Sequence, residues 1–331
     1  MSSDVYSLKN TTLIGIIVGS IILGLVIGGF SGYSLAPSGG EDFDLPEMDA
    51  FRMGFIPAKP ENVNSITTNA GAFSDFLSEE LGIPVEVYPV GNGYEELILA
   101  FQNGQVDAAF LDGTPSHFVV ESGHAEVVLA ELRSANNAPF YNAAAWVRAD
   151  SPINSISTML NGSFISAHTS ETGTAGMVMP LGTLIESGDI VLQDGDDTVS
   201  VLERYFIDSL IGGSYGGALL NVLNGNADVA FVRDTTPMDL YPERADEVRL
   251  LHVFGKVPSH PVVVSTELAE GWKFKFVNAM LKLNDQENVQ ILTDLYGAPG
   301  LVGANNLHLK DVSAAIANLP WLEQTFLEKK K

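Results

Sequence analysis

One local pattern occurs twice in this chain, about 120 residues apart, and it limits the folds open to the sequence. Residues 99–112 and residues 220–234 each contain a helix end, an Asn-Gly stop, an aspartate, and a short apolar strand with an acidic residue at its exit. Any helix–strand unit can show such a stop, because Asn and Gly favour the left-handed conformation that ends helices. The shared Asp107 and Asp228, each followed by an Ala-Phe pair, indicate two similar α/β lobes. The spacing is too long for a solenoid repeat.

Strand and helix signals alternate after residue 50. We expect strands at 51–56, 85–88 and 106–111, with amphipathic helices at 68–81 and 94–102 between them. This βαβ order predicts an α/β fold with parallel-rich sheets covered by helices on both faces. Ligands in such folds bind at the carboxyl ends of the strands, where loops lead into helices.

A turn rich in glycine and hydroxyl groups, residues 170–176, follows the apolar run 163–167 and precedes a helix expected at 181–186. The first N–H groups of a helix have no partner within it, and the helix dipole adds positive potential, so such a turn can bind an anion. Small residues would let the backbone approach the ligand. A capped helix start without a ligand is the alternative interpretation. The candidate ligand-binding residues of this turn are Thr172, Gly173, Thr174, Ala175 and Gly176.

The N-terminal region contains an uncharged apolar run, residues 13–30, which is long enough to cross a bilayer. We predict a cytoplasmic stub at 1–12, a transmembrane signal anchor at 13–36 and a linker at 37–50. Ser34-Leu35-Ala36 could be a cleavage site, so removal of the segment stays open. Either interpretation places the remaining chain on the extracytoplasmic side of the membrane. The sequence has no cysteine, which excludes a lipoprotein anchor and structural disulfides.

The chain is strongly acidic, with 41 acidic against 17 basic residues and a formal net charge of −24. This charge argues against nucleic acid and anionic lipid surfaces as partners. It is compatible with an anion site, because helix N-termini act within their first turn and bulk charge is screened beyond about 10 Å. The six histidines lack metal-binding spacing, and no glycine-rich nucleotide loop is present, so we expect neither a metal nor a cofactor.

Four short motifs occur in the order found in one transport family: Gly54-Phe-Ile-Pro57, residues 103–107, residues 148–153 and residues 174–180. Over roughly residues 51–300 the chain resembles the phosphonate-binding subunits of ABC importers, which belong to the type II periplasmic substrate-binding proteins. The resemblance implies two α/β lobes joined by two crossing strands, a ligand enclosed between them, and delivery to an ABC permease.

The lobe boundaries follow from the resemblance and the strand pattern. We expect lobe one to comprise residues 51–146 plus 262–331, and lobe two to comprise residues 150–258. The crossings are then expected near residues 146–148 and 261–264.

The resemblance also implies ligand-binding residues. The family's turn after the first aspartate-containing strand matches Gly113, Thr114 and Ser116, with His117 in place of a tyrosine. Family tyrosines match Tyr94 and Tyr141. The family's phosphonate loop matches residues 173–176. Thr174 and Gly176 keep the family's threonine and final glycine, whereas both flanking serines of the family are lost.

A family Gly-Ser-His-Glu segment aligns with residues 213–216, which places Tyr215 at the candidate site and replaces the acid by glycine. This difference disfavours a ligand with an aminoalkyl tail. Phosphite, phosphate or a simple alkylphosphonate then remains. Independently of the family, helix starts after Asp112 and Ser170 can offer N–H groups and hydroxyls to one tetrahedral oxyanion.

We therefore expect a membrane-tethered, extracytoplasmic solute-binding protein for a phosphorus oxyanion, and not an enzyme. One alternative is a binder of another small anion, a sulfonate or a carboxylate. Another is a membrane-anchored serine hydrolase, since residues 212–216 match the G-x-S-x-G elbow around Ser214. Its triad partners would come from Asp228, Asp234, His252 and His260. Asn161 is a glycosylation acceptor by pattern, and its occupancy stays open.

Overall fold

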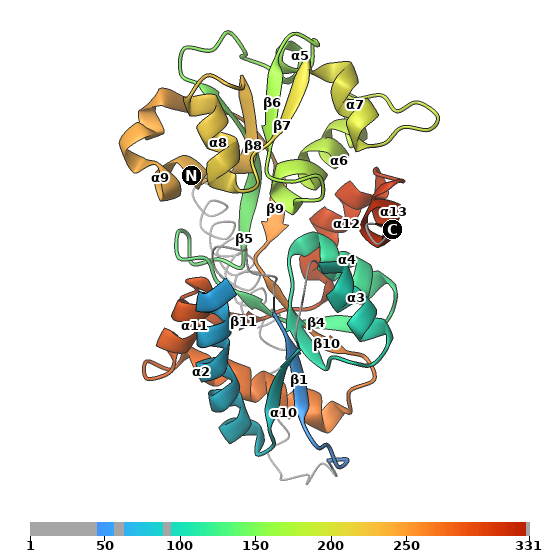
Figure 1. The fold of residues 1–331 in the computed structure, drawn as a ribbon, viewed down its shortest axis with the longest axis vertical. Coiled ribbons are helices and arrows are strands. Elements are labelled where there is room, and N and C mark those ends of the chain that lie inside the picture. Colours follow the sequence, from blue (N-terminus) through green and yellow to red (C-terminus); the bar gives the residue numbers. More distant parts are fainter. Residues whose placement is uncertain (1–44, 56–62, 89–93, 329–331) are drawn as a thin grey trace, which may run out of the picture. The chain divides into compact units, whose positions relative to one another are not determined.

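Two mixed β-sheets organise the part of the chain that the computed structural model describes, residues 45–55, 63–88 and 94–328 (Figure 1). The predicted membrane anchor at 13–36 lies outside these residues, as do the predicted stub and most of the linker. Among the described helices, none has both the length and the apolar character that a bilayer span requires.

The first sheet has the strand order β11-β4-β10-β3-β1-β2. Its strands are β1 (Phe51–Gly54), β2 (Val85–Tyr88), β3 (Ala108–Phe110), β4 (Ala125–Glu131), β10 (Pro261–Ser265) and β11 (Leu301–Gly303). β1 runs parallel to β2 and β3, whereas β10 runs antiparallel to β3 and β4. β11 pairs antiparallel with β4 at the edge.

The second sheet has the order β7-β6-β8-β5-β9. Its strands are β5 (Phe140–Arg148), β6 (Ile165–His168), β7 (Asp208–Ile211), β8 (Val229–Arg233) and β9 (Val248–Pro258). β6 is parallel to β7 and β8, and β5 is antiparallel to β8 and β9.

The expected parallel-rich sheets are wrong in detail, because five of the nine described strand pairings are antiparallel. Four of these pairings involve the first strand that the chain forms after it crosses from one sheet to the other. β5 follows a strand of the first sheet and β10 follows a strand of the second, and each pairs antiparallel with both neighbours. The βαβ units themselves are parallel, as the pattern predicted.

The internal repeat is confirmed by equivalent positions in the two sheets. Gly104 and Gly225 end the two helices with φ values of 61° and 74°. Asp107 then accepts a hydrogen bond from the N–H of Arg52 at 2.7 Å, and Asp228 accepts one from the N–H of Ile165 at 2.8 Å. Each aspartate therefore ties its own strand to the start of the neighbouring parallel strand.

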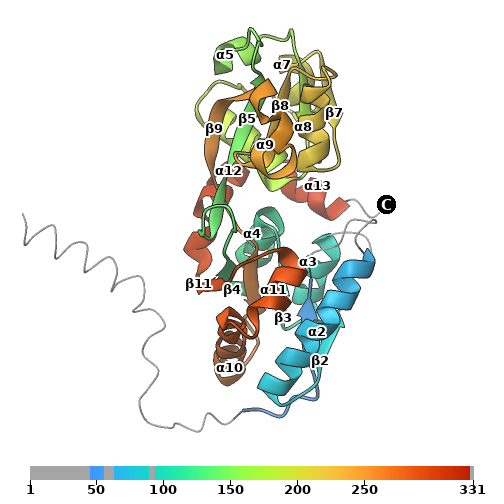
Figure 2. The ribbon, with the colours of Figure 1, turned by 90° about the vertical axis from the view of Figure 1, so that its left-hand side faces the viewer.

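Helices cover both sheets. In the first half they are α2 (Val63–Leu81), α3 (Tyr94–Gln102), α4 (Gly113–Glu121), α5 (Ile156–Met159), α6 (Met179–Glu186) and α7 (Thr198–Tyr205). In the second half they are α8 (Tyr215–Leu223), α9 (Thr236–Leu240), α10 (Glu270–Leu281), α11 (Val289–Tyr296), α12 (Lys310–Ala317) and α13 (Leu322–Glu328). Helices α2, α10 and α11 pack together against the first sheet (Figure 2).

An aromatic cluster forms the core of the first sheet. Phe51 of β1 stacks on Phe276 of α10, with ring centroids 5.0 Å apart. Phe73 of α2 meets Phe55 and Phe110 edge to face, at 5.4 and 5.9 Å. Burial of these rings fixes α2 and α10 on the sheet, because each large aromatic side chain removes much apolar surface from water.

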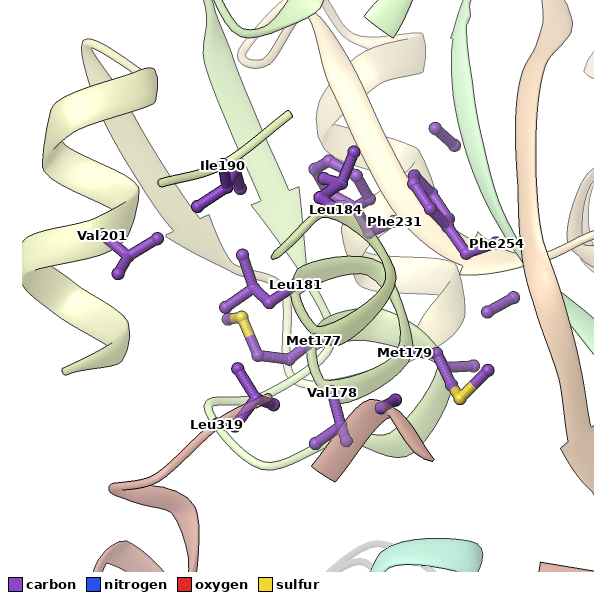
Figure 3. Packing of buried hydrophobic residues seen from close by; sticks show 14 of the residues in the cluster. Met177, Val178, Met179, Leu181, Leu184, Ile190, Val201, Phe231, Phe254 and Leu319 are labelled. Atoms are coloured by element: carbon purple, nitrogen blue, oxygen red, sulfur yellow. The ribbon is translucent and has the colours of Figure 1, made fainter. Parts of the chain in front are cut away.

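The core of the second sheet is completed by the C-terminal helices. Leu319 lies with Val178 and Leu181 in one buried cluster (Figure 3). The indole N–H of Trp321 donates to Thr198 Oγ1 at 2.8 Å. At Gly182 of α6 a Cβ atom would lie 2.3 Å from the carbonyl oxygen of Ala315, so α6 and α12 approach at backbone distance.

The sheets divide the chain differently from the expected lobes. β5 belongs to the second sheet from residue 140, so the chain passes between sheets in residues 132–139 and again in 259–260. Residues 310–328, expected in lobe one, contribute to the core of the second sheet. Neither an apolar strand nor an apolar helix face carries a local sequence signal for the sheet that it joins, and this explains the difference.

Candidate anion-binding site

Helix α4 begins directly after β3, at the carboxyl end of that strand. The Asp112 side chain accepts a hydrogen bond from the N–H of Gly113 at 2.8 Å and caps the helix. A Cβ atom at Gly113 would lie 3.1 Å from both Pro258 and Thr174. The first turn of α4 therefore lies against β9 and the Thr174 turn of the second sheet.

The helix after β6 begins earlier than the predicted residue 181. A π-helical turn, Thr174–Val178, leads directly into α6, and the carbonyl of Gly173 accepts from the N–H groups of both Met177 and Val178. Sequence patterns miss π turns, because their spacing differs from that of α-helices.

The glycines of this turn serve packing. A Cβ atom would lie 2.3 Å from Thr169 Oγ1 at Gly173, and 2.2 Å from the same atom at Gly176. The expectation that these residues are small to admit a ligand is therefore incomplete, since both accommodate the side chain of Thr169. Ala175 belongs to the buried core of the second sheet, and Thr172 is half-buried.

The two helix starts meet at a pair of threonines. Thr174 Oγ1 accepts a hydrogen bond from the N–H of Thr114 at 3.1 Å, and the two hydroxyl oxygens are 2.8 Å apart. Both side chains are buried, with exposed fractions of 0% and 1%. Donors from two different sheets thus converge on one point.

Ser116 and His117, in the same helix, have different surroundings. The Ser116 hydroxyl is buried, and in the described part of the chain it has no hydrogen-bond partner. His117 Nδ1 lies 2.9 Å from Ser313 Oγ of α12, and burial lowers the pKa of His117. The structure therefore brings Thr114 and Thr174 together, whereas His117 contacts the C-terminal helix.

A tyrosine pair lies next to these helix starts. The hydroxyls of Tyr141 and Tyr215 are 3.0 Å apart, and burial raises the pKa of both, with the charge of Asp112 adding to the effect. Arg233 lies over both rings, at 4.8 Å from Tyr215 and 5.8 Å from Tyr141, and Arg133 lies over Tyr141 at 4.9 Å. Tyr94 begins α3, and its side chain is outside the described part.

A cavity of about 400 Å³ opens beside Tyr141. It is lined by Glu131, Leu132, Arg133, Ser134, Ala135, Asn136, Tyr141, Arg233, Thr235, Asp239, Tyr296 and Gly297. Neither arginine of this cavity was among the residues predicted from the sequence. Arg133 lies in the crossing segment and Arg233 ends β8, and neither lies in a recognisable motif. The only sequence signal that could have drawn attention to them is the small number of basic residues in this acidic chain.

Ser214 has a structural role. Its side chain caps α8 by accepting from the N–H of Gly217 at 3.0 Å. His260 Nδ1 lies 2.7 Å from Glu131, and His252 packs against Phe254. Among the described residues, no hydrogen bond joins Ser214 to a histidine, so the geometry gives no support to the hydrolase alternative.

The described residues contain no group of three side chains suited to hold a metal ion.

His168 supports the π turn from the core. Its Nδ1 is 2.9 Å from the carbonyl oxygen of Gly176, its Nε2 is 2.9 Å from Ser166 Oγ, and its ring stacks on Phe231 at 4.8 Å. Burial lowers the pKa of His168 from 6.5 to about 4, against a raising effect of the Gly176 carbonyl.

Stability is therefore expected to depend on pH through His168. Between pH 6.5 and about 4 the unfolded chain binds a proton that the folded chain does not, so the free energy of unfolding falls as pH falls, by up to about 3 kcal/mol. Urea denaturation across this range should show a shallower pH dependence in His168→Gln than in the wild type. His252→Gln, at an exposed site, is the control. Equal slopes for all three proteins would contradict this prediction.

Comparisons with known proteins agree with this architecture. A family model described as the periplasmic substrate-binding protein of phosphonate ABC transporters matches residues 53–309. A binding protein component of an ABC phosphonate transporter from Pseudomonas aeruginosa is 20% identical, with a TM-score of 0.58 over 86% of this chain and 100% of that chain.

Two further solved structures are similar. A protein from Xanthomonas citri bound to ATP is 18% identical, with a TM-score of 0.66 over 84% of this chain and 99% of that one. PhnD1 from Prochlorococcus marinus, in complex with methylphosphonate, is 18% identical, with a TM-score of 0.61 over 82% of this chain and 98% of that one. At these identities the likenesses show a common fold.

Proposed function

Since this chain belongs to the family of periplasmic substrate-binding proteins of phosphonate ABC transporters, we propose that it captures a phosphorus oxyanion between the start of α4 and the helix start at Thr174. The ligand class is a phosphonate, phosphite or phosphate, which the protein then delivers to its permease. The methylphosphonate complex of the similar Prochlorococcus protein supports this ligand class.

The observation that carries the proposal is the contact between Thr114 and Thr174. Their hydroxyl oxygens, 2.8 Å apart, leave no room for a tetrahedral anion between them. Ligand binding therefore requires the two helix starts to separate, so that ligand oxygens take over these hydrogen bonds. The crossing segments 132–139 and 259–260 are where such a hinge motion would occur.

The donors at this position suit a charged ligand. The start of α4 would contribute the N–H and the hydroxyl of Thr114, because the Gly113 N–H is bonded to Asp112 and Pro115 has no N–H. The helix start at Thr174 would contribute its first N–H groups and the Thr174 hydroxyl, and the buried Ser116 hydroxyl would add a donor. Hydrogen bonds to an ionised oxygen are about twice as strong as neutral ones. A ligand that bonds to both helices at once would then stabilise an arrangement in which the two helix starts lie on either side of it.

We also propose that residues 13–30 anchor the protein in the membrane. An uncharged run of this length can span a bilayer, and the linker that follows would hold the binding domain close to the permease. Extraction tests this proposal: the full chain should stay with membranes in high salt and be released by detergent. Release of the intact chain by salt alone would contradict it.

Calorimetric titration of the full chain tests the ligand class. Methylphosphonate, phosphite or phosphate should bind, and sulfate, methanesulfonate and acetate should bind more weakly. In Thr174→Ala the loss of one charge-assisted bond, about 1.5–3 kcal/mol, should lower affinity about tenfold to a hundredfold or slightly more. Thr266→Ala, at an exposed threonine that bonds to Gly123, is the control. Heat from a sulfonate or carboxylate, with none from any phosphorus anion, would overturn the proposal.

A further inference from the structure

We propose that the cavity beside Tyr141 binds a second anionic group of the ligand, so that the preferred ligands are phosphonates with a negatively charged tail, such as a carboxylate. This inference rests on the proposed phosphonate site and extends it from the phosphorus group to the rest of the ligand. It concerns the two arginines that the cavity brings together.

Arg133 and Arg233 come from different parts of the fold. Arg133 follows β4 in the segment that crosses between sheets, and Arg233 is the last residue of β8 in the second sheet. The two guanidinium groups lie 4.9 and 5.8 Å from the centre of the Tyr141 ring. The chain has only 17 basic residues against 41 acidic ones, and two of the basic residues contact this one tyrosine, in a cavity that Glu131 and Asp239 also line.

Neither guanidinium is fully paired within the protein. Arg133 Nη1 lies 3.3 Å from Glu131, whose other oxygen is bonded to His260 at 2.7 Å. Arg233 Nη2 is 3.7 Å from Asp239 Oδ2, which is beyond hydrogen-bond distance. The Nε atoms of both arginines are buried and have no hydrogen-bond partner among the described residues. A guanidinium has five N–H donors, and carboxylate and phosphate are the partners that match its geometry.

Two polar side chains of the crossing segment that line the cavity are already engaged. The Asn136 amide donates to the carbonyl of Phe140 and accepts from the N–H of Ala138. The Ser134 hydroxyl donates to the carbonyl of Gly297 at 2.7 Å.

The two carboxylates are engaged as well. Glu131 is 1% exposed and shared between Arg133 and His260, and Asp239 accepts from the Thr235 hydroxyl at 2.7 Å. The cavity therefore has unused donors and few unused acceptors, which favours an anionic tail over an ammonium tail.

Tyr141 relates this cavity to the proposed phosphonate site through Tyr215 and Asp112. It lines the cavity, and its hydroxyl is bonded to that of Tyr215. The charge of Asp112, the residue that caps α4, acts on both tyrosines. A volume of about 400 Å³ lies within the range of small-molecule pockets, so the cavity has room for a short tail.

Calorimetric titration of the full chain with three ligands of similar size tests this inference: phosphonoacetate, propylphosphonate and 2-aminoethylphosphonate. We expect phosphonoacetate to bind at least tenfold more tightly than propylphosphonate. In Arg233→Gln and in Arg133→Gln this ratio should fall about tenfold, because each variant removes a charge-assisted bond to the carboxylate. Arg148→Gln, at the far end of β5, should keep the wild-type ratio, and binding of methylphosphonate by each variant reports on its folding.

The outcomes separate this inference from the proposed function. Equal affinity for phosphonoacetate and propylphosphonate, or a preference for 2-aminoethylphosphonate, overturns the anionic tail and leaves the phosphonate site intact. An unchanged ratio in both arginine variants likewise overturns the role of the cavity. Failure of methylphosphonate and of all three ligands to bind the wild type overturns the proposed function, and this inference with it.

Discussion

Thr174→Asp is expected to lower the affinity for a phosphorus oxyanion by roughly a thousandfold. The side chain at this position lies 2.8 Å from the Thr114 hydroxyl, where the two helix starts meet. A carboxylate there would face the ligand at about 4 Å, and like charges at that distance repel by about 4 kcal/mol at an effective dielectric constant near 20. Calorimetric titration with methylphosphonate measures the loss.

Thr174→Asn is the matched control, because it has nearly the same shape as aspartate without the charge. It should lose much less affinity than the aspartate variant. The fold should tolerate both residues, since aspartate and asparagine are favoured near helix N-termini. Unchanged affinity in a folded Thr174→Asp protein would show that the anion binds elsewhere.

Phe231→Ala is expected to lower the free energy of unfolding by about 3–5 kcal/mol. Phe231 is 1% exposed and lies in the core of the second sheet (Figure 3), with ring centroids 4.8 Å from His168, 5.7 Å from Phe254 and 6.1 Å from Phe206. Its truncation removes buried apolar surface and leaves a cavity among three rings. Urea denaturation at pH 7 measures the change.

A surface substitution provides the comparison for Phe231→Ala. Ile207, next to β7, is 67% exposed, so Ile207→Ala should change the free energy of unfolding by no more than about 0.5 kcal/mol. Similar losses in the two variants would mean that Phe231 does not support the core as its contacts indicate.

The sequence predicted the elements whose signals are local. β1, β2 and α3 lie where alternating or helical apolar patterns placed them, and Asp107 and Asp228 marked two equivalent units. These elements could be predicted because short apolar runs bounded by turn residues and helical apolar spacing are local signals.

The features that the sequence did not predict depend on contacts between distant segments. The π turn at Thr174 is held by His168 and Thr169, and no local pattern encodes its wider spacing. Arg133 and Arg233 are 100 positions apart in the sequence and meet only because the crossing segment ends beside β8. The helix start at Thr114 was predicted, whereas the start at Thr174 was expected at residue 181, and the direct contact of the two threonines depends on the packing of two sheets.

The packing of α12 and α13 also has a consequence for the order of events during folding. Residues 312–326 supply part of the apolar core of the second sheet, and the backbone of Ala315 closes against Gly182. During synthesis from the N-terminal end, the second sheet therefore lacks this part of its core until residues 312–326 have been made. Contacts over such sequence distances form slowly, so we expect the second sheet to mature last and to set the folding rate of the binding domain.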